Sequence, residues 1–429
     1  MSGRLFKSST LQILLAIVCG VLLGVFDPPL AVYMKPLSDG FIRVIGWLMP
    51  LMMFLLVSSG VAGLRGGGTR LAGKVWVYFQ LMSVVSLCFG ALIALLFAPG
   101  VSDGVGHLGS TAILQWSGNG PVPPIAGEDN LLKTDFSWSI VGAVMARAFT
   151  QSLILQVMLA GLLFGVLIGH SGTAGNALRL RLERVVGALF KLLKLILLFA
   201  PIAAFGAMAF TIGKFGLGSA LPLLKFVAVM YLACGLFVVL ILALVARIAG
   251  ARLSRLVLYV KDELLVVTFT GSSVAALPGL IEKMHKLGCD QQLVRLVLTT
   301  GYTFNLSGSN IYLMVAVLFL AQMSGIHMSG VELFTLLLVT MLTSLGSTSM
   351  AGSAFFTLIA TLNLLHGVPL EGVGLLLGVE RLMKCRSLTN VLGNCVACLA
   401  IARWQNAVDR PVLAKVLLGP AADVLPLKR

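Results

Sequence analysis

The amino-acid sequence predicts an all-α polytopic membrane protein, and its composition, its charge distribution and its apolar runs support this fold class. Of the 429 residues, 58% are hydrophobic and 11% are charged, whereas a soluble chain carries roughly 25% charged residues. The 31 basic residues exceed the 16 acidic ones, but they are spread over short loops instead of forming one stripe, which argues against a nucleic-acid partner. We therefore expect the chain to lie in a membrane, in contact with its lipids.

Six apolar runs come first along the chain. A spanning helix needs about 20 mostly apolar residues, and such runs lie near 10–27, 41–63, 75–99, 139–169, 186–211 and 220–248. The first run resembles a signal peptide, but no small-residue cleavage site follows it, and Asp27-Pro28-Pro29 is typical of a helix end. We therefore expect six membrane helices before residue 250.

Charges in the loops predict the orientation of these helices. The loops after the second, fourth and sixth runs are basic, whereas the long loop 100–138 carries four acidic residues and one lysine. Because Lys and Arg mark cytoplasmic loops, we expect a cytoplasmic N-terminus and an external loop 100–138. The basic tail after residue 405 is also expected in the cytoplasm, so the number of complete crossings is even.

Two later apolar runs are interrupted by Ser and Gly residues. The interruptions lie at 270–273 within the run 264–284, and at 346–353 within the run 331–365. Each half is too short to span a bilayer at about 1.5 Å of rise per residue. Non-helical backbone at membrane depth is tolerated only where it is buried or lines a cavity. The sequence therefore predicts two re-entrant helical hairpins whose tips meet inside the protein.

A longer helix follows each hairpin, and each contains an Asn-x-x-Gly segment, at 305–308 and at 390–393. We expect a weak point in both helices at these segments. Interrupted segments at matching positions of an internal duplication are typical of secondary transporters. Ser and Gly could instead serve only to pack helices closely, but two matched tips favour a transporter.

The last predicted helix, at about 371–404, carries Glu380, Arg381, Lys384 and Arg386. An ionisable group at mid-bilayer costs at least about 2.5–3.5 kcal/mol on insertion scales, so each needs a partner or a function. Glu380 and Lys384 are four residues apart, which predicts an ion pair on one helix. Arg381 lies near enough to the helix end to reach the interface.

Arg386 lies on a polar helix face. That face follows three-to-four spacing and consists of Met383, Arg386, Asn390, Gly393, Asn394 and Ala397. A planar guanidinium binds a carboxylate through two bonds, and the N-termini of the hairpin half-helices add positive dipole ends. The face therefore favours an anion, in particular a carboxylate. The alternative is that Arg386 forms a buried pair with an acid of the chain.

In these segments the sequence resembles the dicarboxylate/amino acid:cation symporter family, and most closely its bacterial C4-dicarboxylate branch. The similarity covers essentially the whole chain and is strongest at 201–214, at 262–265 leading into Ser272-Ser273, at Gly301-Tyr-Thr-Phe-Asn-Leu306 and at Arg386-Ser-Leu-Thr-Asn390. It implies an inverted-repeat, elevator-type transporter of eight transmembrane helices and two re-entrant hairpins. It also implies a homotrimer in the bacterial inner membrane and no enzymatic activity.

The resemblance divides the chain into three regions. Residues 1–250 would form six helices that serve as scaffold, trimer contact and part of the transport domain. Residues 251–405 would hold both hairpins, the last two helices and the core of the site, and residues 406–429 would form a cytoplasmic tail. The implied activity is symport of succinate, fumarate or malate with a cation.

Site residues follow from the family's motifs, position by position. Those implied to bind substrate are Ser272, Ser273, Ser309, Met350, Ala354, Arg386 and Asn390. Those implied to bind the cation are Gly301, Thr303, Asn305, Ser307, Ser347, Asn390 and Asn394. No resident metal and no cofactor are expected beyond the co-transported H⁺ or Na⁺.

Several positions depart from the family's pattern. Ser307 stands where an aspartate is usual, and Asn394 where an acid often lies, so strong sodium sites are not expected and protons are the expected driver. One residue fewer separates Glu380 from Arg386, which would rotate the upper part of a continuous helix by about 100°. The position that pairs with an amino acid's ammonium falls at Met383, which favours a substrate without an amine.

Three other functions stay open. The chain could carry acidic amino acids or other carboxylates, or it could be a degenerate member that acts as a sensor or an uncoupled anion leak. A Gly-x-Ser-Gly string at 169–172 matches intramembrane serine proteases, but no histidine lies within a predicted span to act as its base. The seven cysteines form no disulfide framework, and the spacing of Cys395 and Cys398 is interpreted as helix packing.

Overall fold

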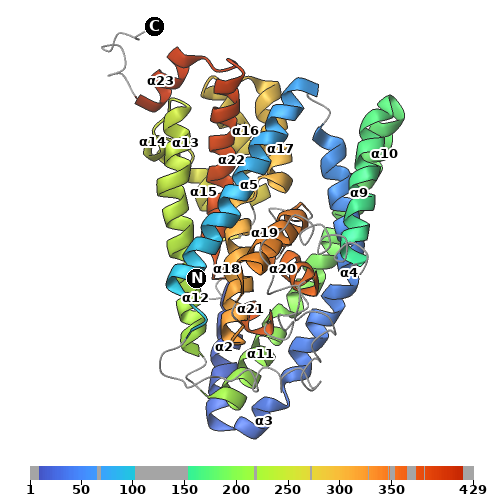
Figure 1. The fold of residues 1–429 in the computed structure, drawn as a ribbon, viewed down its shortest axis with the longest axis vertical. Helices are drawn as coiled ribbons and strands as arrows, with labels where there is room; N and C mark the ends of the chain where they lie inside the picture. The colour runs from blue at the N-terminus through green and yellow to red at the C-terminus, as the bar shows by residue number, and fades with distance from the viewer. Residues whose placement is uncertain are drawn as a thin grey trace, which may run out of the picture.

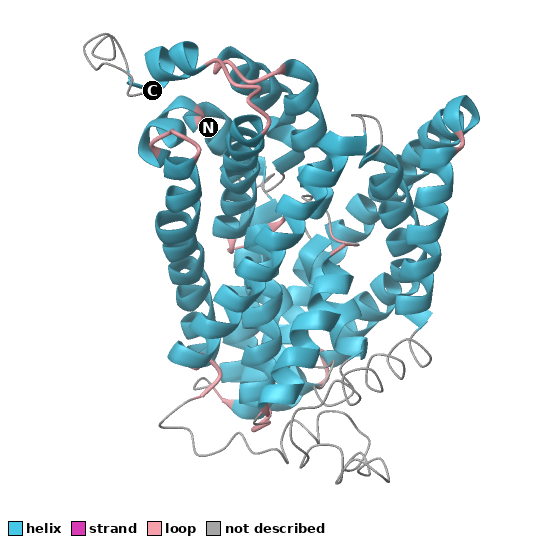
Figure 2. Ribbon diagram, turned by 45° about the horizontal axis from the view of Figure 1, so that its top comes forward, coloured by secondary structure: helices cyan, strands magenta, loops and turns pink. Residues whose placement is uncertain are grey.

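The computed structural model describes residues 9–64, 69–101, 153–216, 220–270, 273–326, 328–345, 347, 353–364, 373–380 and 382–418. Nearly all of them are helical, as Figure 2 shows. Among these residues the only β-type pairing is a single antiparallel bridge between Cys289 and Val408. The predicted all-α class is therefore confirmed.

Four helical segments of the described part, two of which contain an irregular stretch, are long and apolar enough to cross a membrane by length and composition. They cover Leu71–Phe97, Leu221–Ile248, Gln291–Met323 and Lys384–Trp404. Shorter apolar helices lie at Leu15–Phe26, Leu159–His170 and Gly330–Ser344. The chain is a multi-pass membrane protein.

The first four predicted runs coincide with helices. They are α2 (Ser9–Phe26), α4 (Lys35–Leu64), α5 (Thr69–Phe97) and α9 (Leu153–His170), and residues 139–152 of the fourth run lie outside the described residues. The expected end of the first helix is confirmed, because α2 stops before Asp27 and a short helix α3 (Pro28–Val32) begins there. The Asp27 carboxylate accepts a hydrogen bond from the Leu30 amide at 3.1 Å, which caps α3.

The fifth and sixth runs are less regular than predicted. The fifth run is split into α10 (Gly172–Ile196), a 3-10 turn and α11 (Ala200–Phe215). Pro201 marks the split, because it lies in the first turn of α11, where the missing N–H removes no helical hydrogen bond and the fixed φ angle suits a helix start. The sixth run forms α12 (Ala220–Leu236), a π-helical segment and α13 (Ala243–Ile248).

The first predicted hairpin follows the short helix α14 (Leu253–Tyr259). Its arms are α15 (Lys261–Thr270) and α16 (Leu277–Lys286), joined by residues 271–272, which lie outside the described residues, and a 3-10 turn at Ser273–Ala276. An ion pair joins the arms near their base, with Lys283 Nζ 2.7 Å from Glu263 Oε2. The two short helices thus form the expected hairpin.

The second hairpin has α19 (Gly330–Ser344) and α20 (Ser353–Leu364) as its arms. Ser329 begins α19 with a capping box shared with Glu332. Two buried hydroxyls join the arms, with Thr343 Oγ1 2.8 Å from Thr361 Oγ1. Of the predicted tip, only Ser347 and Ser353 onward are described.

The helix after the first hairpin breaks where the sequence predicts. α17 (Gln291–Phe304) and α18 (Ser307–Met323) are separated by Asn305 and Leu306. Both residues leave the helical region, with ψ angles of 67° and 56°. The weak point predicted at 305–308 is therefore confirmed.

The helix after the second hairpin breaks at a different place. α21 (Val373–Glu380) ends before α22 (Lys384–Trp404) begins, and Met383 has φ −80° and ψ 59°. The prediction of one helix over 371–404 is therefore wrong, and so is the weak point at 390–393, through which α22 runs unbroken. The Asn390 side chain bonds to α18 instead of competing for its own backbone, so the helix continues.

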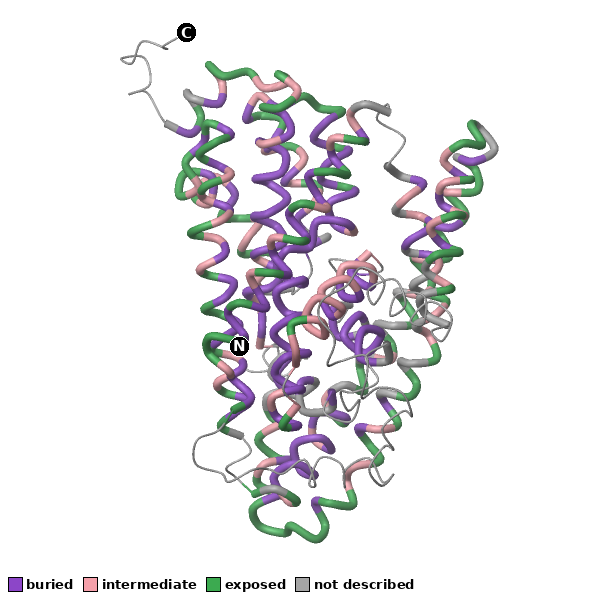
Figure 3. The backbone as a smooth tube through the Cα atoms, viewed as in Figure 1, coloured by how far each residue is buried: buried purple, intermediate pink, exposed green. Residues whose placement is uncertain are grey.

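Helix α22 lies at the centre of the fold. It packs against α18, α17, α15, α12 and α5, and buried backbone follows α18 and α22 in Figure 3. After α22 the chain turns into α23 (Arg410–Leu418), at the end of the molecule where Figure 1 marks the C-terminus. The two helix breaks are thus placed inside the bundle, where backbone ends can meet a ligand.

Candidate functional site

Asn390 joins α22 to the broken start of α18. Its Oδ1 accepts hydrogen bonds from the Gly308 amide at 2.8 Å and the Ser309 amide at 3.2 Å. Its Nδ2 donates to Ser309 Oγ at 3.0 Å. The first N–H groups of a helix have no partner within it, so Asn390 caps α18 from a distant part of the chain. Gly308 permits this approach, because a Cβ there would collide with the Arg386 carbonyl.

The Arg386 side chain is buried beside this junction. Its Nη2 lies 2.8 Å from Glu380 Oε1, and its guanidinium lies over the Tyr312 ring at 5.0 Å from the centroid. The other terminal nitrogen, Nη1, is buried and has no hydrogen-bond partner among the described residues. One side of the guanidinium is therefore paired, and one nitrogen is available to a ligand.

The pairing corrects the prediction for Glu380. The expected Glu380–Lys384 pair assumed one continuous helix, but the two residues lie on different helices, and Glu380 pairs with Arg386. The break after α21 lets its C-terminal residue reach the first turn of α22. The alternative that Arg386 pairs with an acid of the chain is thus correct.

The first hairpin reaches α22 at the residue after Arg386. Ser273 is fully buried and its hydroxyl donates to the Ser387 carbonyl at 3.3 Å. From the second hairpin, Ala354 is fully buried in the first turn of α20, which packs against α18. Ser272 and Met350 lie outside the described residues. The structure therefore brings Ser309, Arg386 and Asn390 together, with Ser273 next to them.

Six of the seven predicted cation residues lie along the α17–α18 break and the neighbouring part of α22, and the seventh, Ser347, lies at the tip of the second hairpin after α19. Asn305 Nδ2 donates to Asn394 Oδ1 at 2.9 Å. Gly301 allows the contact between the helices, since a Cβ would collide with Asn394 Oδ1. Thr303 is only partly buried.

Several polar atoms of this group are buried without a partner in the described part of the chain. They are Asn305 Oδ1, Ser307 Oγ, Ser347 Oγ and Asn394 Nδ2. A buried polar group without a hydrogen bond costs about 1–3 kcal/mol, and such groups are rare in native structures. Three of the four atoms are neutral oxygens, which is the ligand type that hard cations prefer. Within the described residues, no cluster of three His, Cys, Asp or Glu could hold a metal ion.

Two polar contacts at the site were not predicted from the sequence. The Arg386 guanidinium lies over the Tyr312 ring, and the position of Tyr312 on α18, one turn after Ser309, was a signal for this contact. Asn310 Nδ2 donates to Ser86 Oγ at 3.2 Å, which joins α18 to α5. The Ser83-x-x-Ser86 spacing within an apolar helix was the signal for that contact.

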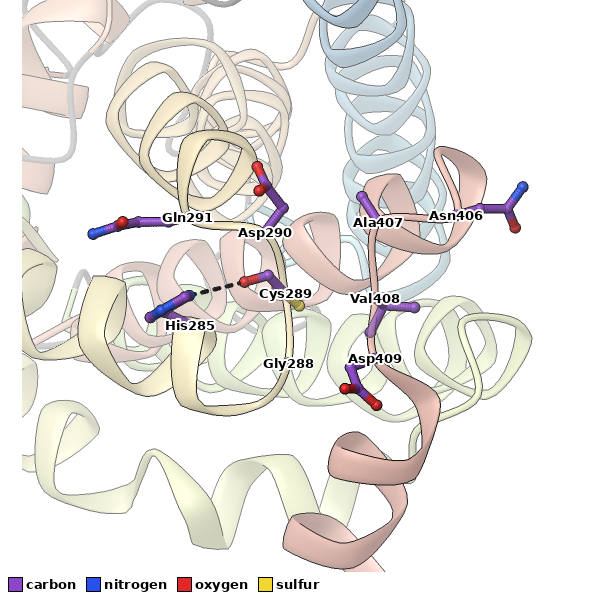
Figure 4. Close-up of a pocket in the computed structure, with 9 residues that line it drawn as sticks. All are labelled: His285, Gly288, Cys289, Asp290, Gln291, Asn406, Ala407, Val408 and Asp409. Carbon is purple, nitrogen blue, oxygen red and sulfur yellow. Dashed lines mark hydrogen bonds between the residues drawn. The ribbon is translucent and has the colours of Figure 1, made fainter.

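A cavity of about 750 Å³ lies at the other end of α22 and is distinct from this site. It is lined by His285, Gly288, Cys289, Asp290, Gln291, Asn406, Ala407, Val408 and Asp409, as Figure 4 shows. The residues near Trp404 are about 27 Å from Arg386 along the helix axis at 1.5 Å per residue.

Beside the cavity, two backbone hydrogen bonds join residues 288–290 to residues 407–409, and we call this pair of bonds the clasp. The Asp290 amide donates to the Ala407 carbonyl at 3.1 Å, and the Asp409 amide donates to the Gly288 carbonyl at 2.8 Å. Burial, with a smaller effect of the Asp290 charge, raises the pKa of the Cys289 thiol to about 12. The clasp holds the chain after α22 against the loop before α17.

In the centre of this membrane bundle, broken helices bring together a buried guanidinium and polar groups that have no partner among the described residues. Such an arrangement is typical of proteins that carry a solute across the membrane. The protein is a membrane transport protein and not an enzyme.

Comparison with known proteins gives the family. A profile of the sodium:dicarboxylate symporter family matches residues 10–404, and the chain belongs to this family. It is 40% identical to C4-dicarboxylate transport protein 1 of Ralstonia nicotianae over 430 residues, which cover 99% of each chain. It is 41% identical to a C4-dicarboxylate transport protein of Burkholderia pseudomallei, over 98% of this chain and 97% of the relative. A Burkholderia ambifaria protein of the same name is 40% identical over 96% of both chains.

Proposed function

We propose that the protein is a secondary active symporter that imports a C4-dicarboxylate such as succinate, fumarate or malate. Transport would cross a bacterial inner membrane and be coupled to cations, with protons as the driver. The names of the relatives support the substrate class, and the family description supports symport.

The observation that carries this proposal is the buried Arg386 with one unpaired nitrogen. Nη2 is held by Glu380 while Nη1 has no partner among the described residues. A guanidinium forms its strongest bonds with a carboxylate that meets two of its nitrogens. We therefore assign one carboxylate of the substrate to Arg386, which would bind it either together with Glu380 or in place of Glu380.

Helix N-termini support an anionic ligand at the same place. α18 begins at Ser307, α20 at Ser353 and α22 at Lys384, and α18 packs against both other helices. Each N-terminus carries about half a positive charge. A dianion next to the starts of α18 and α22 and one guanidinium would be better stabilised than a neutral solute.

The charge of the substrate also determines how many cations must be transported with it. Moving a dianion inward against −100 mV costs about 4.6 kcal/mol, at 2.3 kcal/mol per charge. Two co-transported cations make the movement neutral and a third makes it favourable. We assign one proton to Glu380, because its protonation would release Arg386 for the substrate.

The character of the cation site favours protons over sodium as the driver. The unpaired atoms of Asn305, Ser307 and Ser347 are neutral oxygens, and a neutral set binds Na⁺ less tightly than one with a carboxylate. The substrate residues assigned are Ser272, Ser273, Ser309, Met350, Ala354, Arg386 and Asn390. The eight-helix topology, the elevator movement, the homotrimer, the three-region division and the cytoplasmic termini rest on the family resemblance.

The test is uptake of radiolabelled succinate into proteoliposomes that contain the full-length protein. One set carries an imposed pH gradient and a second set carries a sodium gradient. We expect accumulation above the external concentration with the pH gradient alone. Liposomes without protein and liposomes with the double variant Glu380→Gln/Arg386→Ala are the controls.

Four results would contradict the proposal. Accumulation driven only by sodium would overturn proton coupling. Equilibration without accumulation would identify an uncoupled leak, and binding without uptake would identify a sensor. Stronger competition by aspartate than by fumarate would favour the amino-acid alternative.

A further inference from the structure

Two buried cysteines from different helices meet beside Arg386. Cys234 lies on α12 and Cys385 is the second residue of α22, and they are 2% and 8% exposed. The two side chains interact where α12 packs against α22. Cys385 Sγ also lies 3.9 Å from the Met230 carbonyl oxygen, one helical turn before Cys234. Neither thiol has a part in the dicarboxylate or cation site described above.

The same turn of α12 also contacts the residues of the break between α21 and α22. The Tyr231 hydroxyl donates to the Leu382 carbonyl at 2.7 Å. The α12 turn from Met230 to Cys234 therefore contacts the residues that lead into α22, immediately before Arg386. A covalent bond at this point would fix the start of α22 to α12.

The surroundings of Cys385 favour reaction of its sulfur. Thiolates form most readily at helix N-termini and next to Lys or Arg. Cys385 lies in the first turn of α22 and is flanked in sequence by Lys384 and Arg386. Cys234 provides a second thiol in contact with it.

We propose that Cys234 and Cys385 form an oxidisable dithiol, a modification site at which a small peroxide joins α12 to α22 through a disulfide. The Cys385 thiolate attacks one peroxide oxygen and the O–O bond breaks. This gives a sulfenic acid and hydroxide, which takes up the thiol proton as water. The Cys234 sulfur then attacks the sulfenic sulfur, and the S–O bond breaks with loss of a second water. Two thiols and one hydrogen peroxide thus give one disulfide and two waters.

The consequence for transport rests on the proposed function, whereas the disulfide itself does not. Arg386 would have to exchange Glu380 for a substrate carboxylate, and a disulfide at Cys385 would restrict the residue next to it. We therefore expect oxidation to stop uptake and a reductant to restore it.

Cys395 and Cys398 provide an internal comparison. Both are fully buried on α22, and they are three residues apart on one helix. Such neighbours have Cβ atoms about 5–6 Å apart, whereas a disulfide needs about 3.5–4.5 Å. The helix thus prevents this pair from forming the bond that Cys234 and Cys385 can form.

The experiment uses full-length protein in proteoliposomes treated with hydrogen peroxide, then with N-ethylmaleimide to block remaining thiols. After digestion, mass spectrometry should find a peptide pair that joins Cys234 to Cys385 and is two hydrogens lighter than the two thiol peptides. Cys385→Ala should abolish this product. Cys398→Ala is the matched control and should retain it.

The proposal is overturned if Cys234 and Cys385 are both fully alkylated after peroxide treatment and unfolding. A link between Cys395 and Cys398 in its place would overturn it as well. A Cys234–Cys385 link that leaves uptake unchanged would support the modification site and contradict its effect on Arg386. Because the link is read by mass, it remains decisive even if succinate proves not to be a substrate.

Discussion

Glu380 Oε1 lies 2.8 Å from Arg386 Nη2, and both side chains are 6% exposed. The pair crosses the break between α21 and α22, so it joins two helices that the sequence presents as one. Two charges taken out of water stabilise each other only while both are present. Removing both charges should therefore restore the stability that is lost when only one is removed, but it should not restore transport.

Replacing Arg386 with Ala removes the positively charged partner of the buried Glu380 carboxylate. We expect this single change to destabilise the protein by about 3–5 kcal/mol and to abolish succinate uptake. The double variant Glu380→Gln/Arg386→Ala should recover most of the melting temperature but no uptake. Thermal unfolding in detergent and uptake in proteoliposomes measure the two effects. Uptake by the double variant would rule out Arg386 as the carboxylate ligand.

Glu380→Gln imitates the protonated acid and removes its charge. Since one of the co-transported protons then has no carrier, uptake should continue down a succinate gradient, but accumulation under a pH gradient should fall below that of the parent. Counterflow with labelled succinate reports the first property and pH-driven uptake the second. A variant that accumulates succinate as strongly as the parent under a pH gradient would show that the proton travels elsewhere.

Ser307→Asp places a carboxylate beside Asn305 and Asn394. A hard cation gains a charged oxygen ligand, so sodium should stimulate uptake at a concentration at least about tenfold lower than in the parent, which corresponds to about 1.4 kcal/mol. The measurement is uptake against sodium concentration at fixed pH. Ser307→Asn is the control, because it adds a side chain of the same size as Asp without the charge, and it should leave sodium dependence close to that of the parent.

Gly301→Ala tests the contact between α17 and α22. The added methyl group would collide with the Asn394 side chain, and overpacking of this kind costs about 1–3 kcal/mol. We expect a lower melting temperature and loss of uptake. Gly235→Ala on α12 is matched, since its Cβ would have no atom within 4 Å, and it should be neutral or slightly stabilising.

Cys289 should resist alkylation in the native protein. With its pKa raised to about 12, about one thiol in ten thousand is ionised at pH 8, and the thiolate is the reactive form. Because the raised pKa keeps the thiol protonated, its reaction with maleimide should accelerate with rising pH up to about 12. Unfolding at pH 8 should expose it at once. Fast labelling of Cys289 in the folded protein at pH 8 would contradict the buried clasp.

Much of the helical pattern could be predicted from hydropathy and from Ser and Gly. The break at Asn305–Leu306 follows from local preference, because Asn and Gly compete with helical hydrogen bonds. The split before α11 also had a signal in Pro201. The hairpin arms were recognisable because each apolar half is too short to span.

The break before α22 had no comparable signal. Leu382 and Met383 are good helix formers, and neither Gly nor Pro lies between Glu380 and Lys384. The break depends on contacts from elsewhere in the fold, namely the Tyr231 hydroxyl and the Arg386–Glu380 pair. Tertiary contacts of this kind are not visible in a local window of sequence.

The site was predictable only in part for the same reason. Spacing and family resemblance bring Arg386, Asn390 and Ser309 together, and in the structure Asn390 is bonded to Ser309 and lies one turn after Arg386 on α22. Tyr312 was not predicted, because an aromatic residue in an apolar run is usually part of the core. Glu380 was assigned the wrong partner because four-residue spacing has meaning only within one helix.

The break between α21 and α22 also affects how the chain can change length over evolution. Within a helix, gain or loss of one residue turns everything beyond it by about 100°. Here Asn390 reaches Gly308 and Ser309 from α22, and the one-residue deletion expected before Arg386 would fall at or before this break. We expect a single insertion or deletion between Glu380 and Lys384 to change the length of the turn without rotating α22. This segment is therefore where we expect related transporters to differ in length while keeping the same residues facing the site.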